Sequence, residues 1–479
     1  MRINLAYGKE GLEVRLPDSL DATVIEPRNR KALADPGAAI RAALRSPIAG
    51  PPLLEIVRRG RRIGIVFSDL TRPLPRPLLL GALLDEIRDI PGTEVILFNA
   101  LGTHRPSPAA ELEEMLGPAI ARRNRIVQNN AYDPGTQADL GRTSFGHPLR
   151  VNAELAACEV IILSGFIEPH LFAGFSGGPK AIMPGMAGQS TVLGNHDARM
   201  IAHPGATWGA TEGNPIWEEA REVVRKLESR DGGKSIFLLN IAMNNDKQVT
   251  GVFAGAWEEA HRRGCAFVRE TAIVPVGRLF DIVVTTNSGW PLDLNVYQAV
   301  KGMSAAARIV RDGGAIVCAS ECREGVPAGS PFESLLASHR NPEAALEAIV
   351  SAAEPLQDQW QAQIQTQIQR RAEIHLLAAG LKDEEIRRIH LLPCRDVAST
   401  VTELARRLGP AARIAILPQG PQTVPELRST ATPDGEVGTG GKNAEPGPCI
   451  RGKPAAAGRD PFPQAAIGRG PTKSRGLRR

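Results

Sequence analysis

Cysteine is scarce in this chain, and the spacing of its cysteines excludes the common thiolate metal sites. Six cysteines occur among 479 residues, and no two of them form a CxxC pair. Structural zinc sites and iron–sulfur clusters need such closely spaced thiolates. Cys318 ends the strand-like run AIVCAS and is predicted to be a buried apolar residue. We therefore expect a reduced, cytoplasmic protein.

Aromatic residues and long apolar runs are also lacking. Aromatic side chains make up 4% of the chain, which argues against a protein that stacks nucleic-acid bases on its rings. No run of about 18 apolar residues occurs, so no transmembrane helix is predicted. The first residues, MRINLAYGKEGLEVRLP, do not have the apolar core of a signal peptide. Neither nucleic acid nor a membrane is an expected partner.

Positive charge is concentrated at one end of the chain. The formal net charge is +5 at pH 7, and residues 428–479 carry ten Lys/Arg against four Asp/Glu. This surplus of six leaves residues 1–427 near −1. The same end is rich in glycine and proline and has almost no apolar periodicity, so it cannot bury enough surface to offset the entropy of ordering. We predict a disordered basic tail over 428–479.

The rest of the chain alternates strand-like and helix-like segments. Short, continuous apolar runs such as RRIGIVFS and CEVIILS are followed by segments with apolar residues at helical spacing. This order is typical of parallel sheets covered by helices. The length exceeds one ordinary core, so the sequence predicts two α/β domains with parallel-rich sheets, over 1–268 and 279–395. The glutamine-rich stretch QDQWQAQIQTQIQ is predicted to be an amphipathic helix.

A glycine-rich loop follows the strand CEVIILS, where ligands bind in open α/β sheets. Residues 164–196 read SGFIEPHLFAGFSGGPKAIMPGMAGQSTVLGNH. Gly177 and Gly178 let backbone N–H groups approach an anion closely. The loop is not a Walker A motif, because a proline precedes its lysine and an alanine follows it. Lys180 is either a solvated lysine after a turn or a partly desolvated amine that can act as a nucleophile.

Other polar side chains also follow predicted strands. SDLTRP comes after RRIGIVF, and GTHRP comes after TEVILFNAL. The carboxyl ends of parallel strands meet at one sheet edge, so these groups can share a site, although each alone also suits an ordinary turn or surface residue. The candidates are Ser68, Asp69, Thr71, Arg72, His104, Arg105, His170, Lys180, His196, Gln298 and Lys301. The histidines interpreted as ordinary structural residues are His147, His203, His261, His339, His375 and His390.

Five motifs together resemble the lactate racemase family that uses a nickel-pincer nucleotide. They are SDLTRP, GTHRP, EPHLFAGFSGGPK, GNH and YQAVKG, in this order. Five motifs in sequence are far more specific than any one of them. The resemblance covers about residues 1–427. It implies an active site in the cleft between the two α/β domains, and a return segment, 396–427, that packs on the first domain.

The resemblance also implies how the cofactor is held. Lys180 matches the lysine that is covalently linked to pyridinium-3,5-bisthiocarboxylic acid mononucleotide nickel. His196 matches the histidine that completes a planar set of four nickel ligands, a geometry that suits Ni(II). Enzymes of cofactor biosynthesis are implied partners. The other residues expected around the cofactor are Asp69, Thr71, Gly177 and Gly178.

The implied reaction inverts a 2-hydroxy acid, either lactate or a related one. A hydrogen α to a carboxylate is weakly acidic, and hydride transfer from the α-carbon to the cofactor avoids forming a carbanion. His104 and His170 match the acid/base pair, one for the hydroxyl of each enantiomer, and imidazole can take and give protons near neutral pH. Arg72, Gln298 and Lys301 match substrate contacts, and an arginine fork binds a carboxylate through two hydrogen bonds. The implied enzyme is an isomerase.

Two other classes remain open at this stage. Three histidines with an open position form a zinc arrangement, so His104, His170 and His196 can belong to a metal-dependent hydrolase. That hypothesis leaves Lys180 and the glycine-rich loop unexplained. The second class is a non-catalytic nucleotide-binding protein whose glycine loop cradles a phosphate.

Overall fold

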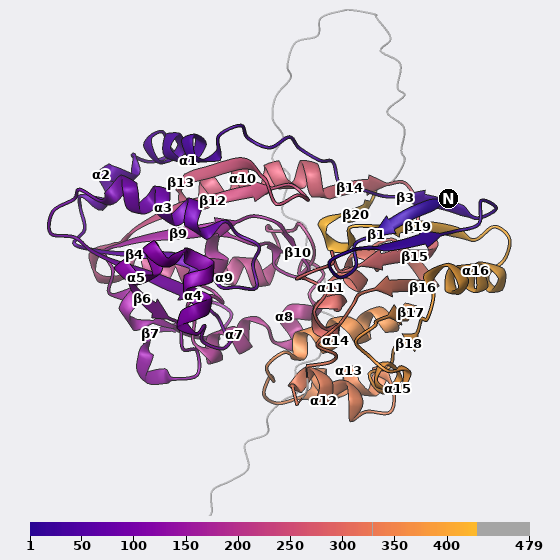
Figure 1. Ribbon diagram of the computed structural model, residues 1–479. Coiled ribbons are helices and arrows are strands. Elements are labelled where there is room, and N and C mark those ends of the chain that lie inside the picture. The colour runs from indigo at the N-terminus through magenta and orange to yellow at the C-terminus, as the bar shows by residue number, and fades with distance from the viewer. Residues whose placement is uncertain (328, 429–479) are drawn as a thin grey trace, which may run out of the picture. The chain divides into compact units, whose positions relative to one another are not determined.

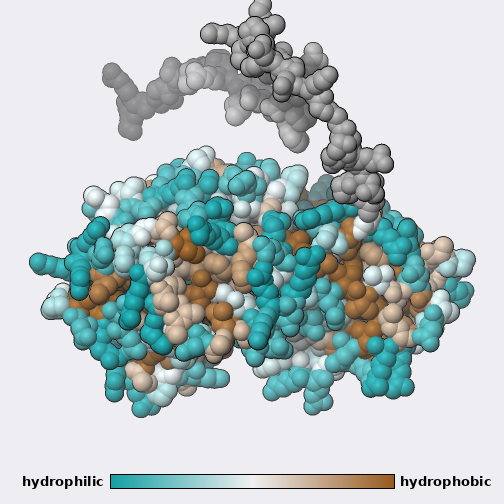
Figure 2. Space-filling view, turned by 90° about the horizontal axis from the view of Figure 1, so that it is seen from above, coloured by the Kyte–Doolittle hydropathy of each residue, from teal (hydrophilic) through white to brown (hydrophobic). Residues whose placement is uncertain are grey.

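The computed structural model describes residues 1–327 and 329–428 (Figure 1). The tail predicted over 428–479 lies outside the described residues from residue 429 onward. Within the described part, no helix is both long and apolar enough to cross a membrane. Hydrophilic side chains cover most of the face shown in Figure 2, and smaller groups of hydrophobic side chains lie between them. Such a mixture is normal, because folded proteins do not have enough polar surface to cover themselves.

The first large sheet has six strands in the order β13–β12–β9–β4–β5–β6. All neighbouring strands are parallel except β12 and β13, which are antiparallel. Side chains of β4 alternate between two hydrophobic clusters, with Ile63 and Ile65 in one and Val66 in the other. Both faces are therefore buried, which explains the continuous apolar runs in the sequence. The strands are β4 Arg62–Ser68, β5 Glu94–Ala100, β6 Arg125–Gln128, β9 Val160–Phe166, β12 Ser235–Met243 and β13 Val249–Ala256.

The second large sheet also has six strands, in the order β18–β17–β16–β15–β19–β3. All of its neighbouring strands are parallel. The prediction of two α/β domains with parallel-rich sheets is confirmed. The strands are β3 Asp21–Val24, β15 Phe280–Thr286, β16 Val310–Ala319, β17 Ala372–Leu377, β18 Leu392–Pro393 and β19 Arg413–Leu417.

The two ends of the described chain correct the predicted domain boundaries. β3 was expected in a first domain over 1–268, but it pairs with β19 in the second sheet. The segment 396–427 was expected to pack on the first domain, but β19 lies between β15 and β3, where Ile414 and Ile416 are buried. Only its last strand, β20 Val424–Leu427, leaves the sheet, and it pairs with β14 Ile273–Val276. Strand pairing between distant segments decided these boundaries.

Smaller strand pairs and helices complete the fold. The N-terminal residues form an antiparallel hairpin of β1 and β2. The remaining strands are β1 Arg2–Leu5, β2 Leu12–Arg15, β7 Gln137–Arg142, β8 Pro148–Asn152, β10 Pro169–His170 and β11 Gly174–Phe175. The helices of the first half are α1 Pro36–Arg45, α2 Leu53–Val57, α3 Arg76–Ile87, α4 Ala109–Leu116, α5 Pro118–Arg123, α6 Ala153–Ala156, α7 Gln189–Asn195, α8 Ala198–Ala202 and α9 Pro215–Glu228. Those of the second half are α10 Trp257–Ala272, α11 Val296–Ala306, α12 Pro331–Ala337, α13 Pro342–Ser351, α14 Gln359–Gln369, α15 Asp383–Arg388 and α16 Val397–Leu408.

The glutamine-rich helix α14 is buried rather than amphipathic, which corrects the sequence prediction. Its glutamine side chains do not face solvent; their amide N–H groups donate to backbone carbonyl groups of neighbouring helices. Gln361 Nε2 donates to the oxygen of Tyr297 over 2.7 Å, and Gln363 Nε2 donates to the oxygen of Ala198 over 2.8 Å. These bonds offset the cost of burying the Nε2 groups, whereas the Oε1 atoms of both glutamines are buried without a hydrogen-bond partner among the described residues. Helix α14 is thereby tied both to α11 and to α8.

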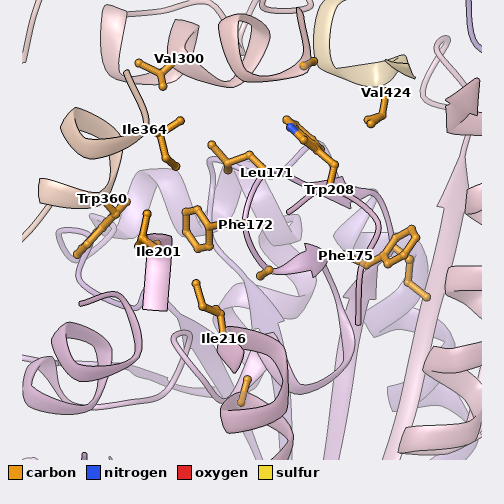
Figure 3. Close-up of a cluster of buried hydrophobic side chains, with 14 of the residues drawn as sticks. Leu171, Phe172, Phe175, Ile201, Trp208, Ile216, Val300, Trp360, Ile364 and Val424 are labelled. Atoms are coloured by element: carbon orange, nitrogen blue, oxygen red, sulfur yellow. The ribbon is translucent and has the colours of Figure 1, made fainter. Parts of the chain in front are cut away.

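One hydrophobic cluster joins the parts of the chain that carry the two sheets. Figure 3 shows Leu171 and Phe172, which follow the first sheet, close to Trp360 and Ile364 of α14. Ile201 of α8 lies beside Trp360 in the same view. This continuous packing fixes α14 and α11 against the loop that follows β9.

Candidate active site

The carboxyl ends of β4, β5 and β9 carry most of the predicted site residues. β4 pairs with both β5 and β9, so the three loops that follow these strands start side by side. They open into a pocket of about 180 Å³ that is also lined by α11 and by the start of α14. The predicted residues that line it are Ser68, Asp69, Thr71, Arg72, His104, His170, Gly177, Lys180, His196, Gln298 and Lys301.

Asp69 and His104 form a short pair at this edge. His104 Nδ1 lies 2.5 Å from Asp69 Oδ2, and the Thr71 hydroxyl donates to Asp69 Oδ1 over 2.7 Å. Burial raises the pKa of Asp69, but the hydrogen bond and charge of His104, with help from Arg72 and Thr71, bring it below its ordinary value. Ionised Asp69 accepts the Nδ1 proton, which leaves the His104 Nε2 lone pair free. This is the arrangement of a general base.

Arg76, which the sequence analysis missed, holds the loop that carries Asp69 and Arg72. It is 5% exposed at the start of α3. Its guanidinium donates to the carbonyl oxygens of Ser68 over 2.7 Å and Arg72 over 2.8 Å, and also to that of Asp69. Burial lowers the pKa of Arg76 to about 10, so it stays charged at neutral pH. The only feature of the sequence that pointed to a buried Arg76 was its position next to the apolar run of a predicted helix.

His170 lies in β10, and its ring proton is on a different nitrogen from that of His104. Its Nδ1 accepts the backbone N–H of Ala173 over 3.2 Å. Burial, followed by the positive charges of Lys180, Lys301 and Arg72, lowers the pKa of His170 well below its ordinary value. The neutral ring therefore carries its proton on Nε2, whereas His104 carries it on Nδ1. At Nε2, His170 is therefore a proton donor and His104 is a proton acceptor.

Lys180 extends into the pocket beside other cations. Burial, and then the charges of Arg72 and Lys301, lowers the pKa of Lys180 to about 7. Burial and Arg72 likewise lower the pKa of Lys301 to about 8. A lysine amine that is partly neutral at pH 7 is a competent nucleophile. The structure thus favours the desolvated amine over the solvated surface lysine.

The two glycines before this lysine have different roles. Gly177 lines the pocket with φ at +74°, and a Cβ there would lie 2.4 Å from Asn240 Oδ1. Gly178 lies outside the pocket lining, and its N–H donates to Asn240 Oδ1 over 2.9 Å. A Cβ on Gly178 would lie 2.6 Å from the ring of His261. Close packing accounts for Gly178.

His196 is held in an apolar and aromatic setting. It is 4% exposed, and its ring meets those of Phe172 and Trp360 edge to face, with centroids 5.0 and 4.9 Å apart. Burial, followed by the charge of Lys180, lowers the pKa of His196 to about 3, so the imidazole is neutral. Its Nδ1 is buried and has no hydrogen-bond partner among the described residues. A neutral imidazole with an unused ring nitrogen is suited to bind a metal.

The geometry does not support a three-histidine zinc site. Residues 1–327 and 329–428 contain no group of three or more His, Cys, Asp or Glu side chains placed to hold a metal ion. His104, His170 and His196 are therefore not arranged as the hydrolase hypothesis requires. A metal bound at His196 would take its other ligands from a non-protein group, and the donor set of this pocket fits a cofactor that brings them.

Comparison with known proteins shows which family this chain resembles. Models of the lactate racemase N-terminal domain and the lactate racemase C-terminal domain match residues 7–209 and 277–424. A lactate racemase from Thermoanaerobacterium thermosaccharolyticum is 31% identical over 423 residues, which cover 87% of this chain and 97% of the relative. A lactate racemase from Lactiplantibacillus plantarum is 33% identical over 384 residues, which cover 80% and 89%. The chain belongs to the lactate racemase family.

Solved structures agree with this membership. The lactate racemase apoprotein from T. thermosaccharolyticum superposes with a TM-score of 0.83 at 30% identity and covers 89% of this chain and all of its own. A protein from Thermotoga maritima, at 18% identity, shares the fold with a TM-score of 0.63. The family resemblance and the isomerase class predicted from the five motifs are confirmed.

This lactate racemase family member has a second-domain pocket wall that the motifs did not reveal in full. Tyr297, Asp358, Trp360 and Gln361 line the pocket beside the predicted Gln298. Trp360 Nε1 donates to the Tyr297 hydroxyl over 2.9 Å. The YQAVKG motif contained Tyr297, but no pattern pointed to the residues around α14, because they reach the pocket only through tertiary packing.

His147, interpreted from the sequence as an ordinary residue, supports the turn that carries His196 in this family member. His147 Nδ1 lies 2.9 Å from the carboxylate of Glu219, and Nε2 lies 3.6 Å from that of Asp197. Glu219 also accepts a hydrogen bond from Asn195 over 2.9 Å. Asp197 and Glu219 raise the pKa of His147 to about 9. Both sequence neighbours of His196 are thus tied to one buried charged pair.

Replacing His147 by alanine is expected to destabilise the protein by about 3–5 kcal/mol, because it leaves the fully buried Glu219 carboxylate without its charged partner. Urea denaturation of the cofactor-free protein measures this loss. The double variant His147→Ala/Glu219→Gln removes the orphaned charge and should recover part of the stability. A change below about 1 kcal/mol in the single variant would show that the pair contributes little.

Lys180 in cofactor-free protein is expected to react with acetic anhydride with a midpoint near pH 7, because its pKa is lowered to about 7. The neutral amine is the reactive form, so labelling should rise as the pH passes upward through this value. Pulsed labelling followed by peptide mass spectrometry gives the profile, and exposed Lys31 in the same digest is the control. Labelling of Lys180 that keeps rising up to about pH 10, as for an unperturbed lysine, would contradict the desolvated amine.

Proposed function

We propose that this chain racemises lactate or a related 2-hydroxy acid with a nickel-pincer nucleotide attached to Lys180. The observation that carries the proposal is one pocket that contains a partly neutral lysine, a neutral metal-competent histidine, and two histidines with complementary ring protons. His196 would supply the protein ligand to nickel. When bound, the cofactor supplies an acceptor for the substrate's α-hydride and a donor that returns it.

The other residues of the pocket bind and orient the substrate. The guanidinium of Arg72 binds the carboxylate, and Arg76 keeps the Arg72 loop in place. Gln298 and Lys301 lie one turn apart on α11 and close the second-domain side of the pocket. Lys301 is largely protonated at pH 7 and adds positive charge toward an anionic substrate.

The two histidines move the hydroxyl proton. His104 Nε2 takes the proton from the hydroxyl of one enantiomer while the α-carbon becomes flat, as in a 2-keto acid. The Nε2 proton of His170 is then available to the oxygen when the opposite configuration forms. The reverse reaction uses the same groups in opposite roles. Asp69 fixes the His104 tautomer that this sequence of steps requires.

The test uses protein produced together with the cofactor-biosynthesis enzymes. Chiral chromatography follows D- and L-lactate and a panel of other 2-hydroxy acids, while intact mass and nickel content report cofactor loading. We expect interconversion of at least one enantiomeric pair, about one nickel per chain, and added mass on the peptide that contains Lys180. Loaded protein that interconverts none of the acids would overturn the proposal. A cytoplasmic location and the biosynthetic partners stay predictions.

A further inference from the structure

Racemisation by two histidines creates a need for proton exchange with solvent. Each inversion in one direction leaves one histidine with an extra proton and the other with a missing proton. Both must be reset before the next molecule of the same enantiomer reacts. The His104 side chain is 51% exposed and can exchange directly. His170 is half-buried and lines the pocket that the substrate fills, so a route on its other side would let it exchange protons while the pocket is occupied.

Glu168 lies where such a route would run. It stands two residues before His170, just ahead of β10, and its backbone continues the pairing of β10 with β11 through Ser176. A cavity of about 50 Å³ is lined by Glu168 and His170 together with Arg72 and Lys301. It adjoins the substrate pocket, because the two share these last three residues in their linings. Its volume is enough for water, which needs roughly 10–15 Å³.

A further cavity continues from Glu168 to the surface. It measures about 100 Å³ and is lined by Glu168 and by the exposed residues Arg28, Asn29 and Lys247. Glu168 is part of both linings, whereas His170 belongs only to the inner one. Glu168 therefore lies at the boundary between a cavity at His170 and a cavity that reaches the surface, together with neighbours such as Pro169 and Gln422 that line both.

The carboxyl group of Glu168 is free to exchange protons. Within the described residues Glu168 is hydrogen-bonded only through its backbone, where its N–H donates to Ser176 Oγ over 3.0 Å and its carbonyl oxygen accepts the N–H of the same residue over 2.8 Å. No ion pair engages its side chain there. Burial raises the pKa of Glu168, and the charges of Arg72 and Lys301 lower it, with a net rise. Such a carboxyl group can take and give a proton closer to neutrality than an ordinary glutamate.

We propose that Glu168 relays protons between His170 and solvent through water in these two cavities. After His170 has taken the hydroxyl proton of a substrate, it passes that proton to water in the inner cavity, that water protonates the Glu168 carboxylate, and Glu168 releases a proton to water in the outer cavity. The opposite direction restores the proton on His170. The route involves no oxidation or reduction, and it rests on the proposed racemase function only for its role in turnover.

The turnover test compares loaded wild-type enzyme with Glu168→Gln at saturating substrate. A direct acid–base group contributes about 10²–10⁴-fold, and we expect loss of the relay to slow steady-state turnover by at least about tenfold. The first turnover, the nickel content and the covalent adduct should stay unchanged. Increasing concentrations of imidazole buffer should restore the rate, because a small diffusible base and acid can replace the relay. Glu168→Asp, which keeps a carboxyl group, should be slowed less.

A second measurement does not depend on racemase activity. Exchange of the His170 ring N–H with water, followed by ¹⁵N NMR of histidine-labelled cofactor-free protein, should be slower in Glu168→Gln, while His104 should be unaffected. Wild-type turnover together with unchanged His170 exchange in Glu168→Gln would overturn the relay. A slowed variant that neither buffer nor aspartate restores would assign Glu168 a purely structural role. If loaded wild-type enzyme racemises none of the acids, the proposed function is wrong. The relay is then tested only by the rate of His170 N–H exchange in wild-type and Glu168→Gln protein.

Discussion

Replacing Lys180 by alanine is expected to remove the covalent cofactor and, with it, essentially all racemase activity. The reason is that Lys180 carries the partly neutral amine of the pocket, with a pKa of about 7, and alanine offers no nucleophile in its place. Intact mass should show no adduct on the variant after co-production with the cofactor enzymes. Nickel should fall as well, because His196 alone supplies one ligand where a planar site needs four.

Two matched variants make this result specific. Lys31→Ala removes an exposed lysine that is not part of the pocket lining and should keep adduct, nickel and activity. Lys180→Arg keeps a positive charge but provides no amine for the link, so it should behave like Lys180→Ala. An active enzyme whose Lys180 peptide is unmodified would show that attachment to this lysine is wrong.

Replacing Asp69 by asparagine is expected to lower kcat by about 10⁴-fold, which is the effect of the analogous change beside a catalytic histidine in serine proteases. The asparagine amide would donate to His104 Nδ1, where the carboxylate now accepts from it at 2.5 Å. The ring proton would then move to Nε2, and the base would be lost. Both directions should slow, because each inversion uses both histidines.

The measurement combines chiral kinetics with histidine ¹⁵N NMR. The spectrum of Asp69→Asn should show the His104 tautomer change, while adduct and nickel should remain as in the wild type. Thr71→Val, which removes the other hydrogen bond to Asp69, keeps the carboxylate and should lose far less activity. An Asp69→Asn enzyme with normal kcat would mean that His104 is not the base in this pocket.

The sequence by itself determined the family and most of the pocket. SDLTRP, GTHRP and the glycine-rich loop each follow a buried parallel strand, and such strand ends meet at one edge of a sheet. This local rule brought Asp69, His104 and Lys180 into one site, as the structure shows. The polar residues are recognisable because they directly follow apolar runs. The cofactor roles of these residues stay predictions.

Only the tertiary structure decided how distant segments complete this site. β19 joins the second sheet by pairing with β15, and β3 joins it by pairing with β19; pairing between segments so far apart in the chain leaves no local pattern. The same holds for α14, whose glutamines look solvent-facing until neighbouring carbonyl groups accept their amides. The ring protons of His104 and His170 were also undecided, because histidine in a sequence has no tautomer. Asp69 and the backbone of Ala173 assign them, through hydrogen bonds that exist only in the folded chain.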